Sequence, residues 1–208
     1  MPEVVWHPSL ENKDVETKEV NLVYDGEFKV KNIQLRHRNF DGEWTGWIWR
    51  EQISRRNAAA VLLWDIEKDV VVLVEQLRIG LVNGTQSSPW LLEIVAGLID
   101  EGETPEQTAM RESQEEAGCE IKQLIKIGEF FNSPGGFVEA THVYLGIVQA
   151  NHAGGIFGLS EEHENIKVHH VPFNDLMEAL NNQQWTSSAS TVIALQWLKN
   201  NKSNLNIE

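Results

Sequence analysis

Three glutamates lie close together in this chain, at Glu112, Glu115 and Glu116. On a helix, residues three or four positions apart are neighbours, so these carboxylates would project from adjoining parts of one face. Like charges at these spacings destabilise a helix by roughly 0.2–0.5 kcal/mol per pair, and a bound cation would offset that cost. Hard divalent ions such as Mg2+ take oxygen ligands and stay bound to substrate phosphates as well. The cluster therefore indicates a cation site for a phosphate substrate, with a solvated acidic face as the alternative.

A helix between Thr104 and Gly118 must carry these glutamates. Thr104 and Gln107 have the form of a capping box, and Pro105 suits the first helical position. Gly118 can adopt the left-handed conformation that ends a helix. The sequence therefore predicts a well-bounded helix of about three and a half turns.

The wider spacing of this segment resembles a known motif, the Nudix box, which is a loop-helix-loop site for metal and diphosphate. The matching residues are Gly97, Glu103, Arg111, Glu112, Glu115, Glu116 and Gly118. Two positions depart from the family pattern, because Ser113 stands where an aliphatic residue is usual and Cys119 where Ile, Leu or Val is usual. Both departures concern the packing of the helix and leave its chemistry intact.

The composition narrows the classes of protein that fit. A chain of 208 residues can bury one core, with a small accessory subdomain. The net charge of -14 argues against a nucleic-acid partner, which needs clustered Lys and Arg. Cys119 is the only cysteine, so no intramolecular disulfide can form. With neither a signal-like N-terminus nor an apolar run of membrane-spanning length, we expect a cytoplasmic protein without a membrane partner.

Hydrophobic patterns predict an α+β fold in two parts, with a boundary after residue 56. Alternating stretches over 17–24, 28–38 and 44–53 predict a small antiparallel sheet. The second part, 57–208, contains more strand-like stretches than helices, too few helices for repeated βαβ units, and this favours an α+β sandwich. Its expected strands are 58–64, 70–76, 91–96, 122–131, 140–148 and 166–171. Its expected further helices are capped by Asn174 and by Ser187 or Ser188.

Similarity to a family extends well beyond the box. The segments around Leu77-Arg78-Ile79, PWLLE, SPGG, GLSEEHENIKVHHV and SASTVIALQWL resemble bacterial ADP-ribose pyrophosphatases of the Nudix superfamily. The resemblance implies a Nudix α/β/α sandwich behind an N-terminal antiparallel β subdomain. It also implies a homodimer in which the subdomain 1–56 is shared, so that both chains build each nucleotide pocket.

The family pattern assigns the metal ligands and the catalytic groups. It implies Mg2+, or Mn2+ in its place, with two or more ions per site. The implied ligands are Glu112, Glu116, Glu164 and the backbone carbonyl of Ala96. Glu115 ligates or tunes the site, and Arg111 orients the box carboxylates through salt bridges while Glu103 holds the loop. Glu162 aligns with the general base, and Glu161 is its alternative.

The substrate contacts are assigned less directly. Arg78 is expected to meet the diphosphate or the terminal ribose because its fork matches phosphate oxygens, and the alternative is a surface salt bridge. Glu139 is expected to contact the terminal ribose or an outer metal. The remaining expected contacts are Phe28, Arg50, Glu51, Gly97, Ser133 and Pro134.

The activity implied by the resemblance is metal-dependent hydrolysis of the diphosphate of ADP-ribose to AMP and ribose 5-phosphate. An alternative is hydrolysis of another nucleotide sugar such as GDP-mannose, since relatives share the box and a similar Ser-Pro-Gly turn. A third possibility is a nucleotide-sensing module without turnover. Because Glu112, Glu115 and Glu116 are all intact and no helix-turn-helix fits at either end, catalysis is favoured over sensing.

Overall fold

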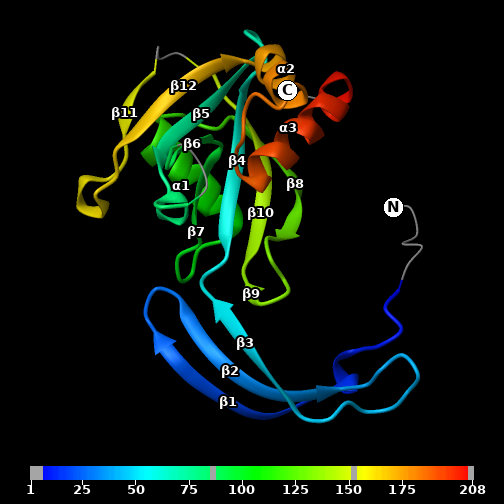
Figure 1. Cartoon of the computed structure of the whole chain (residues 1–208). Coiled ribbons are helices and arrows are strands. Elements are labelled where there is room, and N and C mark those ends of the chain that lie inside the picture. Colours follow the sequence, from blue (N-terminus) through cyan, green and yellow to red (C-terminus); the bar gives the residue numbers. More distant parts are fainter. Residues whose placement is uncertain (1–6, 85–87, 151–153, 206–208) are drawn as a thin grey trace. The chain divides into compact units, whose positions relative to one another are not determined.

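The structure is a computed structural model that describes residues 7–84, 88–150 and 154–205. Contacts divide it into two compact units, which are visible in Figure 1. Unit 1 takes Met1–Arg55 and Ser133–Glu139, and unit 2 takes Arg56–Asn132 and Ala140–Glu208. The return of 133–139 to unit 1 was not expected from the sequence. Within the described ranges, no helix is long and apolar enough to cross a membrane.

Unit 1 is a four-stranded sheet in the order β1-β2-β3-β9. Its strands are β1 (Val15–Asp25), β2 (Lys29–His37), β3 (Ile48–Ser54) and β9 (Phe137–Val138). The first three pair antiparallel, as their alternation predicts, whereas β9 pairs parallel to β3 at Ile53↔Phe137. The late strand β9 was missed because two residues are too short to show periodicity.

Unit 2 is built on a mixed eight-stranded sheet with the path β11-β12-β5-β4-β10-β8. The strands are β4 (Ala58–Asp65), β5 (Val70–Leu77), β6 (Trp90–Glu93), β7 (Val95–Leu98), β8 (Gln123–Phe131), β10 (Ala140–Ile147), β11 (Gly155–Phe157) and β12 (Ile166–Pro172). The central pair β4 and β10 is parallel, and β10 pairs antiparallel with β8. This mixture of strand directions with few helices confirms the predicted α+β class.

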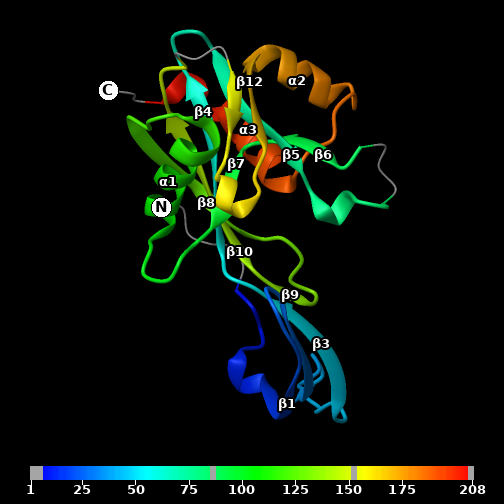
Figure 2. The same cartoon turned by 90° about the vertical axis from the view of Figure 1, so that its left-hand side faces the viewer.

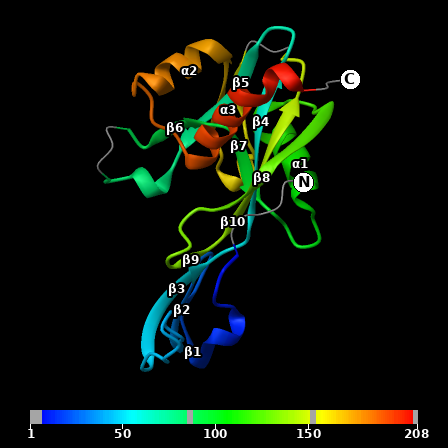
Figure 3. The same cartoon turned by 90° about the vertical axis from the view of Figure 1, so that its right-hand side faces the viewer.

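Helices cover both faces of the unit 2 sheet. All residues of β4 are buried, and alternate side chains face opposite ways, as a strand requires. Leu62 and its same-face neighbours pack with Leu176 of α2 (Phe173–Asn181) and Leu195 of α3 (Ala189–Asn201). Val61 lies in the opposite core with Ala109 of α1 (Pro105–Ala117). Figures 2 and 3 show α1 and α2 on opposite sides of β4, which gives the sandwich its three layers.

The chain between β5 and α1 changes partner in the middle of the sheet. The stretch 91–96 was predicted as one strand, and this is wrong: β6 pairs with β5, and β7 pairs with β4. Ile94, with no exposed surface, separates the two short strands. The change is possible because β4 and β5 pair only near their turn, from Leu63↔Val72 to Asp65↔Val70. The sheet divides beyond that point, and β7 delivers the chain to α1.

The helix α1 has the predicted ends. The Thr104 hydroxyl accepts from the Gln107 N–H, and the Gln107 side chain accepts from the Thr104 N–H, which completes the capping box. Gly118 ends the helix at φ 60°. Of the two departures from the family pattern, Ser113 satisfies its buried hydroxyl by donating to the Ala109 carbonyl at 2.6 Å, and Cys119 is buried among apolar residues.

The caps of the last two helices were predicted less well. Asn174 was expected to cap α2, but the helix begins at Phe173 after Pro172, whose ring has no N–H to leave unpaired. For α3 the N-cap is Ser188, one of the two expected residues, although its hydroxyl makes no capping hydrogen bond. That hydroxyl instead lies 2.8 Å from the Thr191 hydroxyl.

Candidate active site

Arg111 ties together the acidic face of α1. Its Nη1 donates to Glu112 Oε1 and to Glu115 Oε2, each at 2.8 Å. Its Nε donates to Glu103 Oε1 at 2.9 Å. The ion pairs with Glu112 and Glu115 are those expected of this arginine, and they offset the repulsion between neighbouring carboxylates. The surrounding carboxylates raise the pKa of Arg111 above its ordinary value, and the hydrogen bond to Glu103 contributes most.

Glu103 fixes the loop that precedes the helix. Its carboxylate accepts from Arg111 and from the Thr108 hydroxyl at 2.8 Å, and it lies 3.4 Å from the Asp100 backbone nitrogen. The hydrogen bonds from Arg111 and Thr108 lower the pKa of Glu103 to about 2. Glu103 is therefore ionised at neutral pH and joins the loop to α1.

Glu116 points away from Arg111 and into the protein. Only 2% of its surface is exposed. One carboxylate oxygen accepts from the backbone N–H of Ala96, and the other from Nε2 of Gln76, both at 3.1 Å. Burial raises the pKa of Glu116 to about 8, and the negative charge of Glu112 adds to the effect of burial. A buried carboxylate of this kind binds a cation readily once it has lost its proton.

Glu112 lies against the backbone of β7. A Cβ on Gly97 would fall 1.7 Å from Glu112 Oε1, so glycine is needed for the side chain to lie there. Burial raises the pKa of Glu112, and the negative charges of Glu115 and Glu164 act in the same direction against Arg111. Gly97 thus forms a cradle for one of the box carboxylates.

The acidic loop, residues 158–165 between β11 and β12, joins the same region. The Gly158 N–H donates to the Glu115 carbonyl at 3.1 Å, which attaches the loop to the helix. A short 3-10 turn, Ser160–Glu162, follows, and His163 takes a left-handed conformation at φ 56°. Glu164 Oε2 accepts from the Leu159 N–H at 3.1 Å. The loop is thus folded by its own hydrogen bonds.

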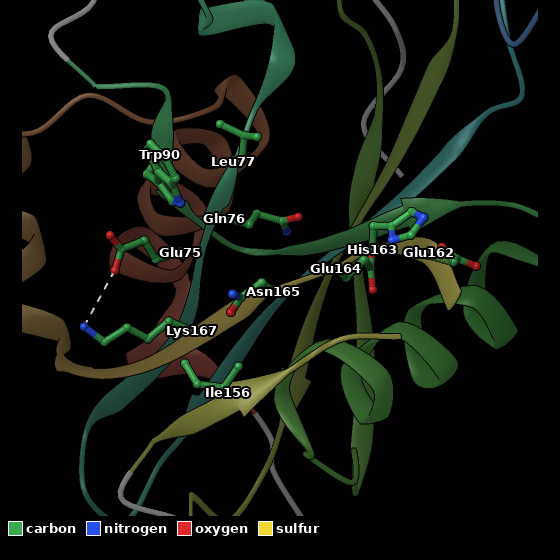
Figure 4. A pocket seen from close by; sticks show the side chains of 10 residues that line it. All are labelled: Glu75, Gln76, Leu77, Trp90, Ile156, Glu162, His163, Glu164, Asn165 and Lys167. Atoms are coloured by element: carbon green, nitrogen blue, oxygen red, sulfur yellow. Dashed lines mark ion pairs between the residues drawn. The ribbon is translucent and has the colours of Figure 1, made fainter. Parts of the chain in front are cut away.

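A pocket of about 530 Å³ opens between this loop and the ends of β5 and β6. Figure 4 shows Gln76 extending from β5 toward the side where Glu162 and Glu164 lie, with Trp90 on the opposite side of Gln76. The residues that line the pocket are Glu75, Gln76, Leu77, Trp90, Ile156, Glu162, His163, Glu164, Asn165 and Lys167. The expected base and one expected metal ligand therefore border a cavity large enough for part of a nucleotide sugar.

The donor chemistry of the site fits a hard divalent cation, because Glu112 and Glu116 offer carboxylate oxygens as ligands. The cradle at Gly97 leaves room for the Glu112 carboxylate. Within the described residues, no three acidic, histidine or cysteine side chains already converge on one point. The hydrogen bonds explain this, since Arg111 holds Glu112 while Gln76 and Ala96 hold Glu116.

Arg78 lies near this group but is already paired. Its Nε donates to Oε1 of Glu93, a carboxylate that is 5% exposed. Its positive charge also acts on Glu116, in the direction that lowers the pKa of that group. The structure therefore contains a salt bridge at Arg78, one of its two expected roles, and contact of Arg78 with substrate stays a prediction.

Apart from Gly97, the other expected substrate residues belong to unit 1. Phe28 and Phe137 lie with ring centroids 6.2 Å apart, and the Arg55 guanidinium is over both rings. Arg55 also pairs with Glu139, which is 2% exposed. The expected Ser-Pro-Gly turn is present, because the Ser133 carbonyl accepts from the N–H groups of Gly136 and Phe137. Pro134 lies in that turn, and Arg50 and Glu51 lie on β3.

Sequence reasoning missed Gln76 and Glu93. Both are buried polar residues in short apolar strands, Gln76 near the end of β5 and Glu93 at the end of β6. A polar residue closing an otherwise apolar strand is the signal that could have identified them. His169 lies beside this region, with its Nε2 2.7 Å from Glu75 Oε2.

The three-layer sandwich and the glycine-bounded helix with its acidic face define a Nudix hydrolase. Residues 54–194 match the NUDIX domain family, and the chain belongs to that family. It is 41% identical over 200 residues to an ADP-ribose pyrophosphatase of Haemophilus influenzae, covering 93% of this chain and 89% of the relative. An ADP-ribose pyrophosphatase of Escherichia coli K12 is also 41% identical, over 186 residues, covering 89% and 88% of the two chains.

Two further comparisons extend this result. A GDP-mannose pyrophosphatase of Cronobacter sakazakii is 35% identical over 191 residues, covering 89% of this chain and 95% of the relative. The fold matches a solved structure described as an ADP compounds hydrolase with a TM-score of 0.70, over 96% of this chain and all of the other. The sequence identity to that structure is 21%, so this likeness shows the fold alone.

Proposed function

We propose that this enzyme hydrolyses the diphosphate of ADP-ribose to AMP and ribose 5-phosphate. The observation that carries the proposal is the 41% identity to ADP-ribose pyrophosphatases over about nine tenths of both chains. The GDP-mannose pyrophosphatases share less, at 35% and 33% identity, and make GDP-mannose the second candidate substrate. In this chain Glu112, Glu115 and Glu116 are all present, as turnover requires.

Glu112, Glu116, Glu164 and the Ala96 carbonyl are the residues proposed to hold Mg2+ or Mn2+, with two or more ions per site. When bound, such ions neutralise charge on the diphosphate oxygens and acidify the attacking water. The hydrogen bonds from Ala96 and Gln76 hold Glu116, and the Gly97 cradle holds Glu112. Arg111 keeps Glu112 and Glu115 on one side of α1.

Glu162 is the proposed general base. It lies on the rim of the pocket beside Glu164, and it is exposed, so it can change partners as substrate enters. Among the hydrogen bonds of the described residues, none links the Glu162 side chain to Glu112, Glu115 or Glu116. The Glu162 carboxylate can therefore accept a proton from water. Glu161, one position earlier, remains the alternative base.

Unit 1 supplies the proposed nucleotide contacts and the proposed dimer interface. Its sheet has exposed apolar side chains with no covering helix in the unit, Val20 and Leu22 on one face and Tyr24, Trp49 and Ile53 on the other. Exposed apolar surface of this kind marks an interaction surface, and a second copy of the chain is the proposed partner. The residues proposed to contact the substrate are Phe28, Arg50, Glu51, Arg78, Gly97, Ser133, Pro134 and Glu139.

A substrate panel tests the proposed activity. Purified protein with Mg2+ is incubated with ADP-ribose and with GDP-mannose, and the products are identified by chromatography. We expect AMP and ribose 5-phosphate, with kcat/KM at least tenfold higher for ADP-ribose. A higher kcat/KM for GDP-mannose would replace the first candidate by the second. Turnover should stop in a chelator and return with Mg2+ or Mn2+, and turnover that persists in the chelator would exclude a metal mechanism.

A further inference from the structure

Gln76 is a polar residue at the end of a buried apolar strand. In β5 the preceding residues 71–74 have no exposed surface, and Gln76 itself is 8% exposed. Its Nε2 donates to Oε1 of Glu116 at 3.1 Å, across 40 positions of sequence. The pair joins the central sheet to the helix that carries the acidic cluster.

Packing alone does not account for this pair. A buried amide and a buried carboxylate both lose water, and apolar residues of similar size at both positions are often neutral or stabilising in proteins. Glu116 is 2% exposed and sits between the two hydrogen-bond donors Gln76 and Ala96. The polar pair is therefore explained by its effect on the orientation of the Glu116 carboxylate.

The two donors fix the orientation of the Glu116 carboxylate. Gln76 binds one oxygen and the Ala96 N–H binds the other, so rotation of the group would break a hydrogen bond on either side. Arg111 takes no part, because its side chain donates to Glu103, Glu112, Glu115 and the Leu98 carbonyl. Gln76 is thus the one side chain that hydrogen bonds to Glu116 among the described contacts.

A neutral donor suits this position. Arg or Lys at position 76 would hold the carboxylate as well, but its positive charge would repel an incoming cation. An amide donates a hydrogen bond without a net charge and uses one of the lone pairs of the oxygen, so another remains for a metal ion. The cation Arg111 donates to Glu112 and Glu115, whereas the neutral amide of Gln76 donates to Glu116.

We propose that Gln76 is a positioning residue that holds the Glu116 carboxylate ready for the divalent cation. The inference rests on the proposed metal role of Glu116 and goes beyond it, since Gln76 acts through Glu116 and is itself no ligand. Partners that orient a metal ligand typically change metal affinity 10–100-fold when they are removed.

Mn2+ binding to the protein without substrate tests this inference. Free Mn2+ is measured by electron paramagnetic resonance during titration of the parent enzyme, Gln76→Leu and Gln76→Asn. Leu removes the donor at similar volume, and Asn keeps the amide but withdraws it from Glu116. Both variants should bind Mn2+ about tenfold or more weakly. The matched control is Glu75→Gln, which changes a neighbouring pocket residue that pairs with His169, and its Mn2+ affinity should equal that of the parent.

Stability measurements separate positioning from packing. The inference predicts weaker Mn2+ binding in at least one variant whose metal-free Tm stays close to that of the parent. If Gln76→Leu and Gln76→Asn fold and bind Mn2+ as the parent does, the inference is wrong while the proposed function stands. If the parent binds no Mn2+, the metal role of Glu116 fails and the inference fails with it. If neither variant folds, Gln76 serves stability, and the inference is again overturned.

Discussion

Glu103 and Arg111 are joined by two hydrogen bonds, from Nε to Oε1 at 2.9 Å and from Nη2 to Oε2 at 3.1 Å. This bidentate geometry is the strongest arrangement open to an arginine and a carboxylate. It fastens the loop before α1 to the middle of the helix. Because the same guanidinium holds Glu112 and Glu115, the loop and the acidic face share one anchor.

Glu103→Gln is expected to lower stability at neutral pH and to have a smaller effect at pH 3, where part of the stabilisation from Glu103 is already lost. The folded-state pKa of about 2 lies below the ordinary value of 4.5. The stabilisation is therefore complete above pH 4.5 and is lost as the pH falls from 4.5 to about 2. At pH 7 the variant should lose about 1 kcal/mol, or about 2–4 °C in Tm. Thermal unfolding at pH 7 and pH 3 measures the change. Glu101→Gln is the control, and an equal loss at both pH values would contradict the assignment.

Gly97→Ala should reduce activity more than stability. The new Cβ would lie 1.7 Å from Glu112 Oε1, so the Glu112 side chain must move away from β7. Moving this carboxylate should lower kcat/KM about tenfold or more. Steady-state kinetics and Tm are measured together, with Gly46→Ala as control because its Cβ meets nothing within 4 Å. Unchanged kinetics in Gly97→Ala would mean that the position of Glu112 is not critical.

Glu116→Gln should remove most turnover and leave the protein folded. The loss of one metal ligand is expected to lower kcat about a hundredfold or more. Burial raises the Glu116 pKa to about 8, so the parent loses stability as the pH rises from 4.5 to 8, and the neutral variant avoids this loss. The metal-free variant should then melt at or above the parent temperature at pH 8. Near-normal kcat would refute the ligand assignment, and Glu106→Gln on the same helix serves as control.

Glu162→Gln should lower kcat by about 10²-fold or more without weakening metal binding. A general base contributes to proton transfer in the transition state, and its removal typically costs 10²–10⁴-fold in rate. Kinetics are compared with Mn2+ titration of the same variant. Loss of the Mn2+ site would show that Glu162 is a ligand and not the base. Glu161→Gln is the neighbouring control, and a larger rate loss there would move the base by one position.

The helix at the centre of the site could be predicted from the sequence because its signals are local. Thr104, Gln107 and Gly118 define its ends through contacts within a few residues, and the structure has the same ends. The ion pairs of Arg111 were also predictable, since its partners Glu112 and Glu115 are neighbours on the helix. Spacing along the chain carries this information by itself.

The contacts made across the sheet could not be predicted in the same way. Gln76 contacts Glu116 only because β5 lies beside α1 in the folded chain. The local hydrophobic pattern of a strand does not tell which elements will be its neighbours. The same holds for the break at Ile94, where β6 and β7 read as one apolar run. For α2, Asn174 looked like a cap, but Pro172 fixed the start of the helix earlier. A polar residue in an otherwise apolar strand is the local sequence signal that still indicates such a contact.

Because the chain changes partner at Ile94, the nine residues from Trp90 to Leu98 connect the two halves of a divided sheet. The strand β6 pairs with β5 on one side of the break, and β7 pairs with β4 on the other. Releasing the segment would leave β4 and β5 without a partner strand where the sheet divides, so its opening is unfavourable. Amides of β7 should therefore exchange with deuterium only as fast as the whole unit unfolds, and the backbone beneath the acidic helix is held by global stability.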